Sequence, residues 1–193
     1  MIELKYGNTN TYLIKGKFAN LLVDTDYAGT LNSFFKEIKN KNLKINDINY
    51  MIVTHYHPDH MGIVRELQDY GIKLIIIDKQ LNYVNFSDDI FKKEKRLGYK
   101  SIDIQSALIV SLPDSRSFLS KLGINGKIVS TPSHSADSIS LILDDGRCFV
   151  GDLEPIDYLL GYENNNLLIK DWEVIMSYSP KVICYGHVNK KVY

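Results

Sequence analysis

The sequence predicts an α/β (α+β) protein, because stretches with strand character alternate with amphipathic helices along the chain. Two observations carry this prediction. Short runs rich in Val, Ile and Leu end at Gly, Asn or Asp, as buried strands do. A strand at 50–54, a helix at 61–70 and a strand at 73–77 also follow one another in the order of a βαβ unit, whose strands are parallel.

In the first part of the chain, turn residues separate three short strands before the first helix. Gly7 with Asn8, and Gly16 between two lysines, mark the turns. The helix places Leu31, Phe34 and Ile38 on one side. The elements we expect here are strands at 2–6, 11–14, 20–24, 50–54 and 73–77 and helices at 30–41 and 61–70.

The second part of the chain is weakly patterned between 79 and 125 and clearly patterned afterwards. The tripeptide Asp144-Asp145-Gly146 predicts a hairpin turn. No repeat, low-complexity tract or Pro/Gly-rich linker divides the chain, so we expect one domain spanning 1–193. The expected elements are helices at 88–97, 115–122 and 167–178 and strands at 107–112, 127–130, 138–143, 148–151 and 181–185.

The composition argues against several classes of partner. Lys plus Arg and Asp plus Glu are both 23, and a balanced charge gives no support for a nucleic-acid partner. No apolar run approaches the ~20 residues of a membrane span, and the first residues lack the pattern of a signal peptide. We therefore expect a cytoplasmic protein with a small-molecule substrate. The oligomeric state is not indicated. Cys148 and Cys184 lie in apolar runs and are expected to be buried free thiols.

All five histidines lie where a metal site would need them. Three belong to the stretch from His55 to His60, and the others, His134 and His187, are isolated. Imidazole is a preferred ligand of divalent zinc, and carboxylates accompany it. The candidate ligands follow predicted strands, so we expect their loops to converge at one sheet edge, with rigid strand ends holding them.

The stretch His-x-His-x-Asp-His, followed by a lone His, an Asp after a strand and a last His, resembles the metallo-β-lactamase superfamily of binuclear hydrolases. The resemblance covers essentially the whole chain. It implies an αββα four-layer sandwich, in which two mixed sheets are flanked by helices. The seven positions that match the signature are His55, His57, Asp59, His60, His134, Asp152 and His187.

By this resemblance the seven residues are metal ligands arranged as two sets and a bridge. Two divalent ions are implied, with Zn²⁺ favoured and Mn²⁺ or Fe²⁺ as alternatives. They share a hydroxide that attacks the substrate, and Asp59 orients this hydroxide or carries a proton to the leaving group. The first set is His55, His57 and His134. The second set is Asp59, His60 and His187, and the bridge is Asp152.

Some positions near the signature stay open between two interpretations. Asp24 resembles a residue that supports the site from outside, but an ordinary turn Asp is an equal alternative. Ser133 and Val188 stand where the superfamily usually has glycine. Asp137 also replaces a glycine, and for Asp137 a role in a turn is favoured over contact with the site. Aromatic candidates for the pocket wall, with core packing as the alternative, are Tyr56, Tyr158, Tyr162 and Trp172.

The aspartate at the bridging position narrows the expected reaction. True β-lactamases of this superfamily often carry Cys there, whereas Asp152 resembles the thioesterase, lactonase and phosphodiesterase branches. We therefore expect hydrolysis of an ester, thioester or lactone bond of a small molecule by an enzyme for which zinc is the favoured metal. The alternatives are a mononuclear iron enzyme resembling persulfide dioxygenases, and a β-lactamase or phosphodiesterase of the same fold. A metal-bound domain without catalysis of its own, and a flavodiiron-type electron carrier, are less favoured.

Overall fold

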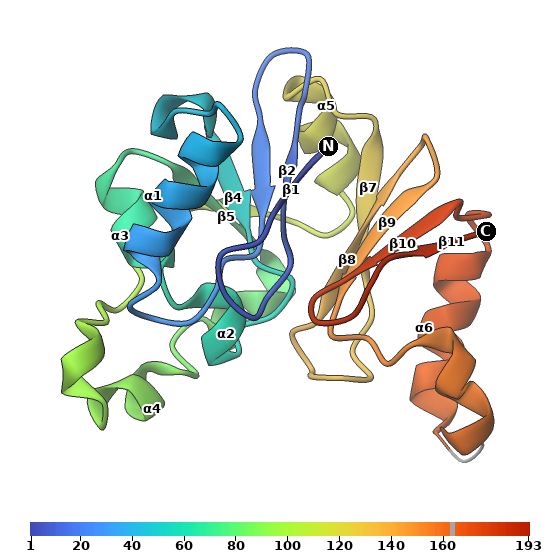
Figure 1. Cartoon of the computed structure of the whole chain (residues 1–193). Coiled ribbons are helices and arrows are strands. Elements are labelled where there is room, and N and C mark those ends of the chain that lie inside the picture. Colours follow the sequence, from blue (N-terminus) through green and yellow to red (C-terminus); the bar gives the residue numbers. More distant parts are fainter. Residues whose placement is uncertain (163–164) are drawn as a thin grey trace.

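Two β-sheets form the centre of the protein (Figure 1). The computed structural model describes residues 1–162 and 165–193. The first sheet has six strands in chain order, namely β1 (Ile2–Leu4), β2 (Thr11–Ile14), β3 (Leu21–Val23), β4 (Tyr50–Ile52), β5 (Lys73–Ile77) and β6 (Leu108–Val110). The second has the order β11 (Lys191–Val192), β10 (Val182–Tyr185), β9 (Arg147–Gly151), β8 (Ile139–Leu143) and β7 (Gly126–Ser130).

Both sheets are mixed. Strands β3 to β6 are parallel neighbours, while β1, β2 and β3 pair antiparallel. In the second sheet β9 and β10 are parallel and the other pairs are antiparallel. Because β7 and β9 both run antiparallel to β8, the strands β7, β9 and β10 all end at the same edge. This direction places the loops after them together.

Helices cover the outer face of each sheet (Figure 1). Helices α1 (Leu31–Asn40) and α3 (Val64–Asp69) pack on the six-stranded sheet through one apolar cluster, and α6 (Asn166–Met176) packs on the five-stranded sheet through another. A third cluster joins the facing sides of the two sheets, with Val23, Ile75, Leu141 and Phe149 among its members. Helix, sheet, sheet and helix are thus the four layers that were predicted. The remaining helices are α2 (Pro58–Met61), α4 (Asp88–Lys92) and α5 (Ser115–Lys121).

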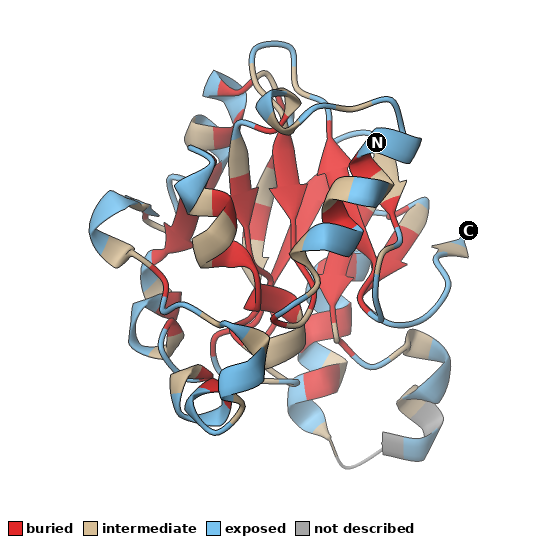
Figure 2. Ribbon diagram, turned by 60° about the vertical axis from the view of Figure 1, so that its left-hand side comes forward, coloured by how far each residue is buried: buried red, intermediate tan, exposed pale blue. Residues whose placement is uncertain are grey.

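Burial follows this layering (Figure 2). The central strands are almost wholly buried, whereas the helices expose one side to solvent. The thiols of Cys148 and Cys184 are free and buried, as expected. Within residues 1–162 and 165–193, no helix combines the length and apolar character needed to span a membrane.

Some predictions about the elements were wrong. The helix expected at 61–70 begins only at Val64, as α3, because Met61 ends the preceding helix α2. Gly62, between the two helices, lies so close to the backbone of Ala28 that a Cβ would be 2.1 Å from its nitrogen. The helix expected at 88–97 ends at Lys92, as α4, and a separate 3-10 turn covers Lys95–Leu97. Strand β11, which pairs with β10, was not predicted, because two residues are too short a run to give a sequence signal.

Candidate metal centre

The candidate ligands meet at the edge where the two sheets are joined, and not at the edge of one sheet as expected. His55 follows β4 of the first sheet, whereas His134, Asp152 and His187 follow β7, β9 and β10 of the second. Backbone hydrogen bonds join the sheets here: the Ile139 N–H donates to the Thr54 carbonyl over 2.9 Å. Strands that end at one edge fix the side chains after them, so both sheets contribute to a single cluster.

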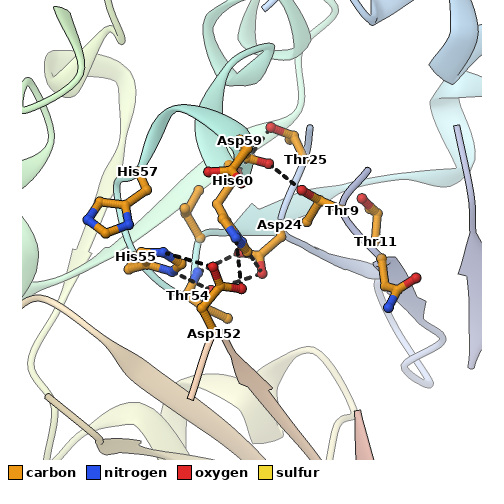
Figure 3. A network of polar contacts seen from close by, with 12 residues as sticks. Thr9, Thr11, Asp24, Thr25, Thr54, His55, His57, Asp59, His60 and Asp152 are labelled. Atoms are coloured by element: carbon orange, nitrogen blue, oxygen red, sulfur yellow. Dashed lines mark hydrogen bonds and ion pairs between the residues drawn. The ribbon is translucent and has the colours of Figure 1, made fainter. Parts of the chain in front are cut away.

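Helix α2 supplies the middle of the cluster. His57 is the residue before the helix, and Pro58 occupies its first turn, where a missing N–H costs nothing. Asp59 and His60 then follow within one turn. The short helix therefore directs the side chains of Asp59 and His60 toward a second group of ligands, although the ring centroid of His60 stays 4.2 Å from that of His55 (Figure 3).

Three histidines form the first group of candidate ligands, His55, His57 and His134. The Nδ1 atom of His57 lies 3.1 Å from Nε2 of His134. The Nε2 atom of His55 is buried and has no hydrogen-bond partner among the described residues. A buried nitrogen without a partner is costly, and a metal ion is one way to satisfy it.

Two acids and two histidines form the second group, Asp59, His60, Asp152 and His187. The Nε2 atom of His60 lies 3.1 Å from Oδ1 of Asp152 and 3.3 Å from Nε2 of His187. His187 Nε2 is in turn 3.1 Å from Oδ2 of Asp59. Ligands about 2.1 Å from a tetrahedral zinc ion lie about 3.4 Å from one another, so these spacings fit a metal ion.

Asp152 lies between the two groups. Its Oδ2 atom is 3.9 Å from Nε2 of both His55 and His134 and 3.3 Å from Nε2 of His187. Gly186 leaves room for this carboxylate, because a Cβ there would be 2.4 Å from Asp152 Oδ1. The carboxylate therefore has the place of a bridge between two ions.

Outer partners hold the other nitrogen of three of the histidines. His60 Nδ1 is 3.1 Å from Oδ2 of Asp24, and His187 Nδ1 is 3.1 Å from the carbonyl oxygen of Asn8. His55 Nδ1 is 3.2 Å from the hydroxyl of Thr54. Such partners fix the ring orientation and leave the inner nitrogen free for a metal, which is the usual arrangement around metal-bound histidines.

Asp24 contacts one of the candidate ligands, His60. It is buried in a left-handed conformation, and its two oxygens also accept the N–H and the hydroxyl of Thr54, at 2.6 and 2.9 Å (Figure 3). One carboxylate thus ties the end of β4, just before His55, to helix α2. Of the two interpretations of Asp24, the geometry favours support of the site over an ordinary turn.

Asp137 and Asp171 hold two of the ligand loops without belonging to either ligand group. Asp137 Oδ2 accepts the N–H of Tyr56, between His55 and His57, over 2.7 Å. Asp171 on α6 accepts the N–H of Ser133, just before His134, also over 2.7 Å. Both are buried. Asp137 therefore does more than cap a turn. The role of Asp171 gave no sequence signal, because α6 is distant in the chain.

The two groups differ in protonation when no metal is bound. Burial lowers the pKa of His55 well below its usual value and also lowers that of His134. Burial alone would lower the pKa of His60, but the carboxylates of Asp24 and Asp152 outweigh it and raise this pKa to about 10. Hydrogen bonds with Asp152 and Asp59 raise the pKa of His187 to about 11.

The carboxylates of the second group respond in the opposite sense. The hydrogen bond from His187 lowers the pKa of Asp59. Burial favours the neutral form of Asp152, but its hydrogen bonds with His187 and His60 dominate and hold its pKa well below the usual range. In the metal-free protein the second group is therefore a set of ion pairs, whereas His55 and His134 are neutral.

Two cavities flank the cluster. One, of about 190 Å³, is lined by His134 and His187 together with Asp152, Leu153, Glu154, Pro155, Tyr185 and Val188. The other, of about 170 Å³, adjoins His57 and is lined by Tyr56, Tyr83, Phe86, Ser135, Ala136 and Asp137. His55 and His60 are buried at the floor of the cluster, while His134 and His187 are exposed at its rim. A small molecule can thus reach the cluster from solvent.

The model of the metallo-beta-lactamase superfamily matches residues 4–187. A beta-lactamase-like protein 2 homolog of Drosophila melanogaster is 26% identical over 189 residues, which is 94% of this chain and 59% of that protein. The chain thus spans less than two thirds of the length of this relative.

Solved structures share the fold at lower identity. The metallo-beta-lactamase family protein TTHA1429 of Thermus thermophilus superposes with a TM-score of 0.73 at 19% identity, over 95% of this chain and 70% of that one. A di-iron-bound form of TTHA1623 gives a TM-score of 0.73 at 16% identity, over 100% and 94%. These structures share the fold, and the match of the family model over nearly the whole chain shows that the chain belongs to the metallo-β-lactamase superfamily.

Proposed function

We propose that the protein is a binuclear metal-dependent hydrolase, with zinc as the favoured metal, that cleaves an ester, thioester or lactone bond of a small molecule. The observation that carries the proposal is the convergence of seven donor side chains into two groups that share Asp152. The unpartnered Nε2 of His55 and the spacing of the second group support it.

The chemistry of the donors fits divalent ions. His55, His57 and His134 would hold one ion. The second group, Asp59, His60, Asp152 and His187, would hold the other. Imidazole and carboxylate ligands suit zinc, manganese and iron. A bound metal pair supplies a hydroxide nucleophile at neutral pH and polarises the bond that is cleaved.

Asp59 has the position for a second task. It is half-buried, it accepts from His187, and its own backbone carbonyl accepts the hydroxyl of Thr9 over 2.7 Å. Its low pKa makes the carboxylate an acceptor at neutral pH. We assign to Asp59 the orientation of the attacking water and the transfer of its proton to the leaving group.

The bridging aspartate guides the choice of substrate. Asp152 offers hard oxygen donors, whereas true β-lactamases of this superfamily often have the soft thiolate of Cys at this position. We therefore place esters, thioesters and lactones ahead of β-lactams and phosphodiesters as substrates. A relative has been solved in a di-iron-bound form, so iron remains the alternative metal.

The test is turnover by the zinc-loaded protein on a panel of 4-nitrophenyl esters, acyl thioesters, lactones, a chromogenic β-lactam and bis(4-nitrophenyl) phosphate. Asp59→Asn should lower kcat by about 10² to 10⁴ on the preferred class, which is the usual contribution of a general acid or base. Asp89→Asn, a change of an exposed aspartate on α4, is the control and should leave kcat unchanged. Full activity of Asp59→Asn would contradict the assigned mechanism, and hydrolysis of the β-lactam or the phosphodiester alone would contradict the substrate class.

A further inference from the structure

We propose that the cavity beside His57 binds an uncharged, apolar or aromatic acyl group of the substrate, and that Phe86 determines the specificity for it. This inference rests on the proposed function, because it places the acyl group beside a metal centre at His57. It concerns a segment, 83–87, that carries none of the candidate ligands.

The first argument is the position of the aromatic ring. Phe86 has 59% of its surface exposed, although it is a large apolar residue, and its ring centroid lies 6.0 Å from that of His57. Tyr56 and Tyr83 line the same cavity. Three aromatic rings thus border one cavity beside a candidate ligand, and aromatic linings with few polar groups are typical of small-molecule sites.

The second argument is that the segment is held in place. The buried hydroxyl of Ser87 donates to the carbonyl of Tyr56 over 2.7 Å, which fastens the segment to the loop of His55 and His57. The N–H of Phe86 also donates to the carbonyl of Tyr83, over 2.8 Å. The backbone that carries the ring is therefore held at a fixed place relative to the ligand loop, which lowers the entropy cost of a binding contact.

The third argument is charge. None of the described residues that line the two flanking cavities is Lys or Arg. The carboxylate in the cavity of Phe86, that of Asp137, already accepts from Tyr56 and from Ser135. Lys79 lies nearby in the fold but donates to Ser130 and Ser138. Apart from the metal ion proposed at His57, no cation borders the cavity among the described residues, so the part of the substrate that fills it away from the metal is best neutral.

The size of the cavity sets the size of the group. Its volume is about 170 Å³, and a cavity of about 150 Å³ lined by apolar side chains accommodates benzene. A phenyl group or a short branched alkyl chain would fill it. The cavity beside His187, about 190 Å³ and bordered by Glu154 and Val188, is left for the other side of the scissile bond.

The test uses metal-binding probes, so that it does not depend on turnover. Acetohydroxamate and benzohydroxamate share the same chelating group, and their affinities for the cobalt-loaded protein can be measured from the visible spectrum of the cobalt. Benzohydroxamate should bind more tightly, and Phe86→Ala should reduce this advantage about tenfold, the value of one good aromatic contact. Acetohydroxamate affinity should not change.

Phe18→Ala is the matched control, because Phe18 is also an exposed phenylalanine, at 70%, but lies between β2 and β3 and lines neither cavity. It should keep the full advantage of benzohydroxamate. The inference is overturned if Phe86→Ala also keeps that advantage, or if Val188→Ala in the other cavity loses it instead. It is equally overturned if 4-carboxybenzohydroxamate binds more tightly than benzohydroxamate.

The two proposals fail separately. If the panel of esters, thioesters and lactones is not hydrolysed but Phe86→Ala loses the preference for benzohydroxamate, the proposed function is wrong and the acyl cavity stands. If the panel is hydrolysed and Phe86→Ala binds both hydroxamates as the wild type does, the cavity is wrong and the proposed function stands.

Discussion

The two ligand groups lie side by side but are prepared for a metal in different ways. The first consists of three histidines, and burial keeps His55 and His134 neutral. The second consists of histidines and carboxylates that form ion pairs, with His60 and His187 protonated in the metal-free protein. A metal can enter the first group without displacing a proton from His55 or His134. At the second group it must displace protons from His60 and His187. The comparison teaches that one cluster can hold two sites with different pH dependence.

The largest effect is expected where the two groups meet. Asp152→Ala removes the carboxylate that contacts both of them and leaves His60 and His187 without one of their partners. Metal content should fall at both sites, and hydrolysis should fall by several orders of magnitude, because the nucleophile depends on the metal pair. Metal analysis and turnover of the purified variant check this. If the variant kept two ions per chain, the bridging role of Asp152 would be refuted.

The next effect separates the groups by pH. The pKa values of His60 and His187, about 10 and 11, lie above neutral, so binding at the second group releases protons and weakens as the pH falls. The low pKa of His55 makes binding at the first group less dependent on pH above about 6.5. Zinc content after dialysis should fall from two toward one ion per chain between pH 8.5 and pH 6. The same dialysis of the cobalt-loaded protein, followed through its visible spectrum, shows which group loses its metal. Equal loss of metal from both groups would contradict the comparison.

A smaller effect is expected from the residues that hold each group from outside. Asp24→Asn disturbs the partner of His60 and should weaken the second site by about 10- to 100-fold. The first site should weaken less, because Asp24 reaches His55 only through Thr54. Asp137→Ala leaves the buried N–H of Tyr56 without its acceptor, at a cost of about 1–3 kcal/mol, and should weaken mainly the first site. Asp137→Asn retains an oxygen acceptor and is the matched control. Cobalt titrations resolve the two sites, and the same loss at both sites from either variant would argue against separate supports.

The smallest effect concerns the stability of the metal-free protein. The folded pKa of His60 is above its unfolded value, so this stabilisation is complete below about 6.5 and is lost as the pH rises toward 10. The folded pKa of His55 is below its unfolded value, so this contribution is present above about 6.5 and is lost on acidification. With a chelator present, Tm should be highest near neutral pH and lower at pH 5 and pH 9.5. A Tm that rises steadily across this range would contradict the assigned protonation states.

Most elements could be predicted from the sequence because their signals are local, whereas the four layers were implied by the resemblance to the superfamily. Strand β5, at Lys73–Ile77, was predicted with the correct bounds, since four consecutive branched or leucine residues follow one lysine. The break between α2 and α3 was missed because the apolar spacing runs on through it, and the need for glycine at position 62 arises from Ala28 of a distant loop. The expectation that all ligand loops meet at the edge of a single sheet was also wrong. The residues of a strand do not reveal which sheet it joins, because that depends on the strands it pairs with.

His55, His57, Asp59 and His60 could be identified from sequence because their spacing is local and their types are distinctive. The isolated His134, Asp152 and His187 were assigned through the resemblance. Of the residues around the ligands, Asp24 was a candidate from sequence, but others gave no signal. Asp171 and Phe86 reach the cluster from α6 and from the weakly patterned stretch after β5, and neither has a motif. Of the aromatic candidates, Tyr56 lines a cavity from a buried position, Trp172 is buried in the core under α6, and Tyr158 is exposed outside both cavities. The side chain of Tyr162 lies outside the described residues.

The most direct test of the account is the number of metal ions that the protein holds at neutral pH. After loading with zinc and removal of loosely bound metal, elemental analysis should give close to two ions per chain, because both groups offer complete donor sets joined by Asp152. His134→Ala and His187→Ala should then each leave close to one. A single ion in the wild type, or a single iron in protein purified without added metal, would contradict the binuclear hydrolase.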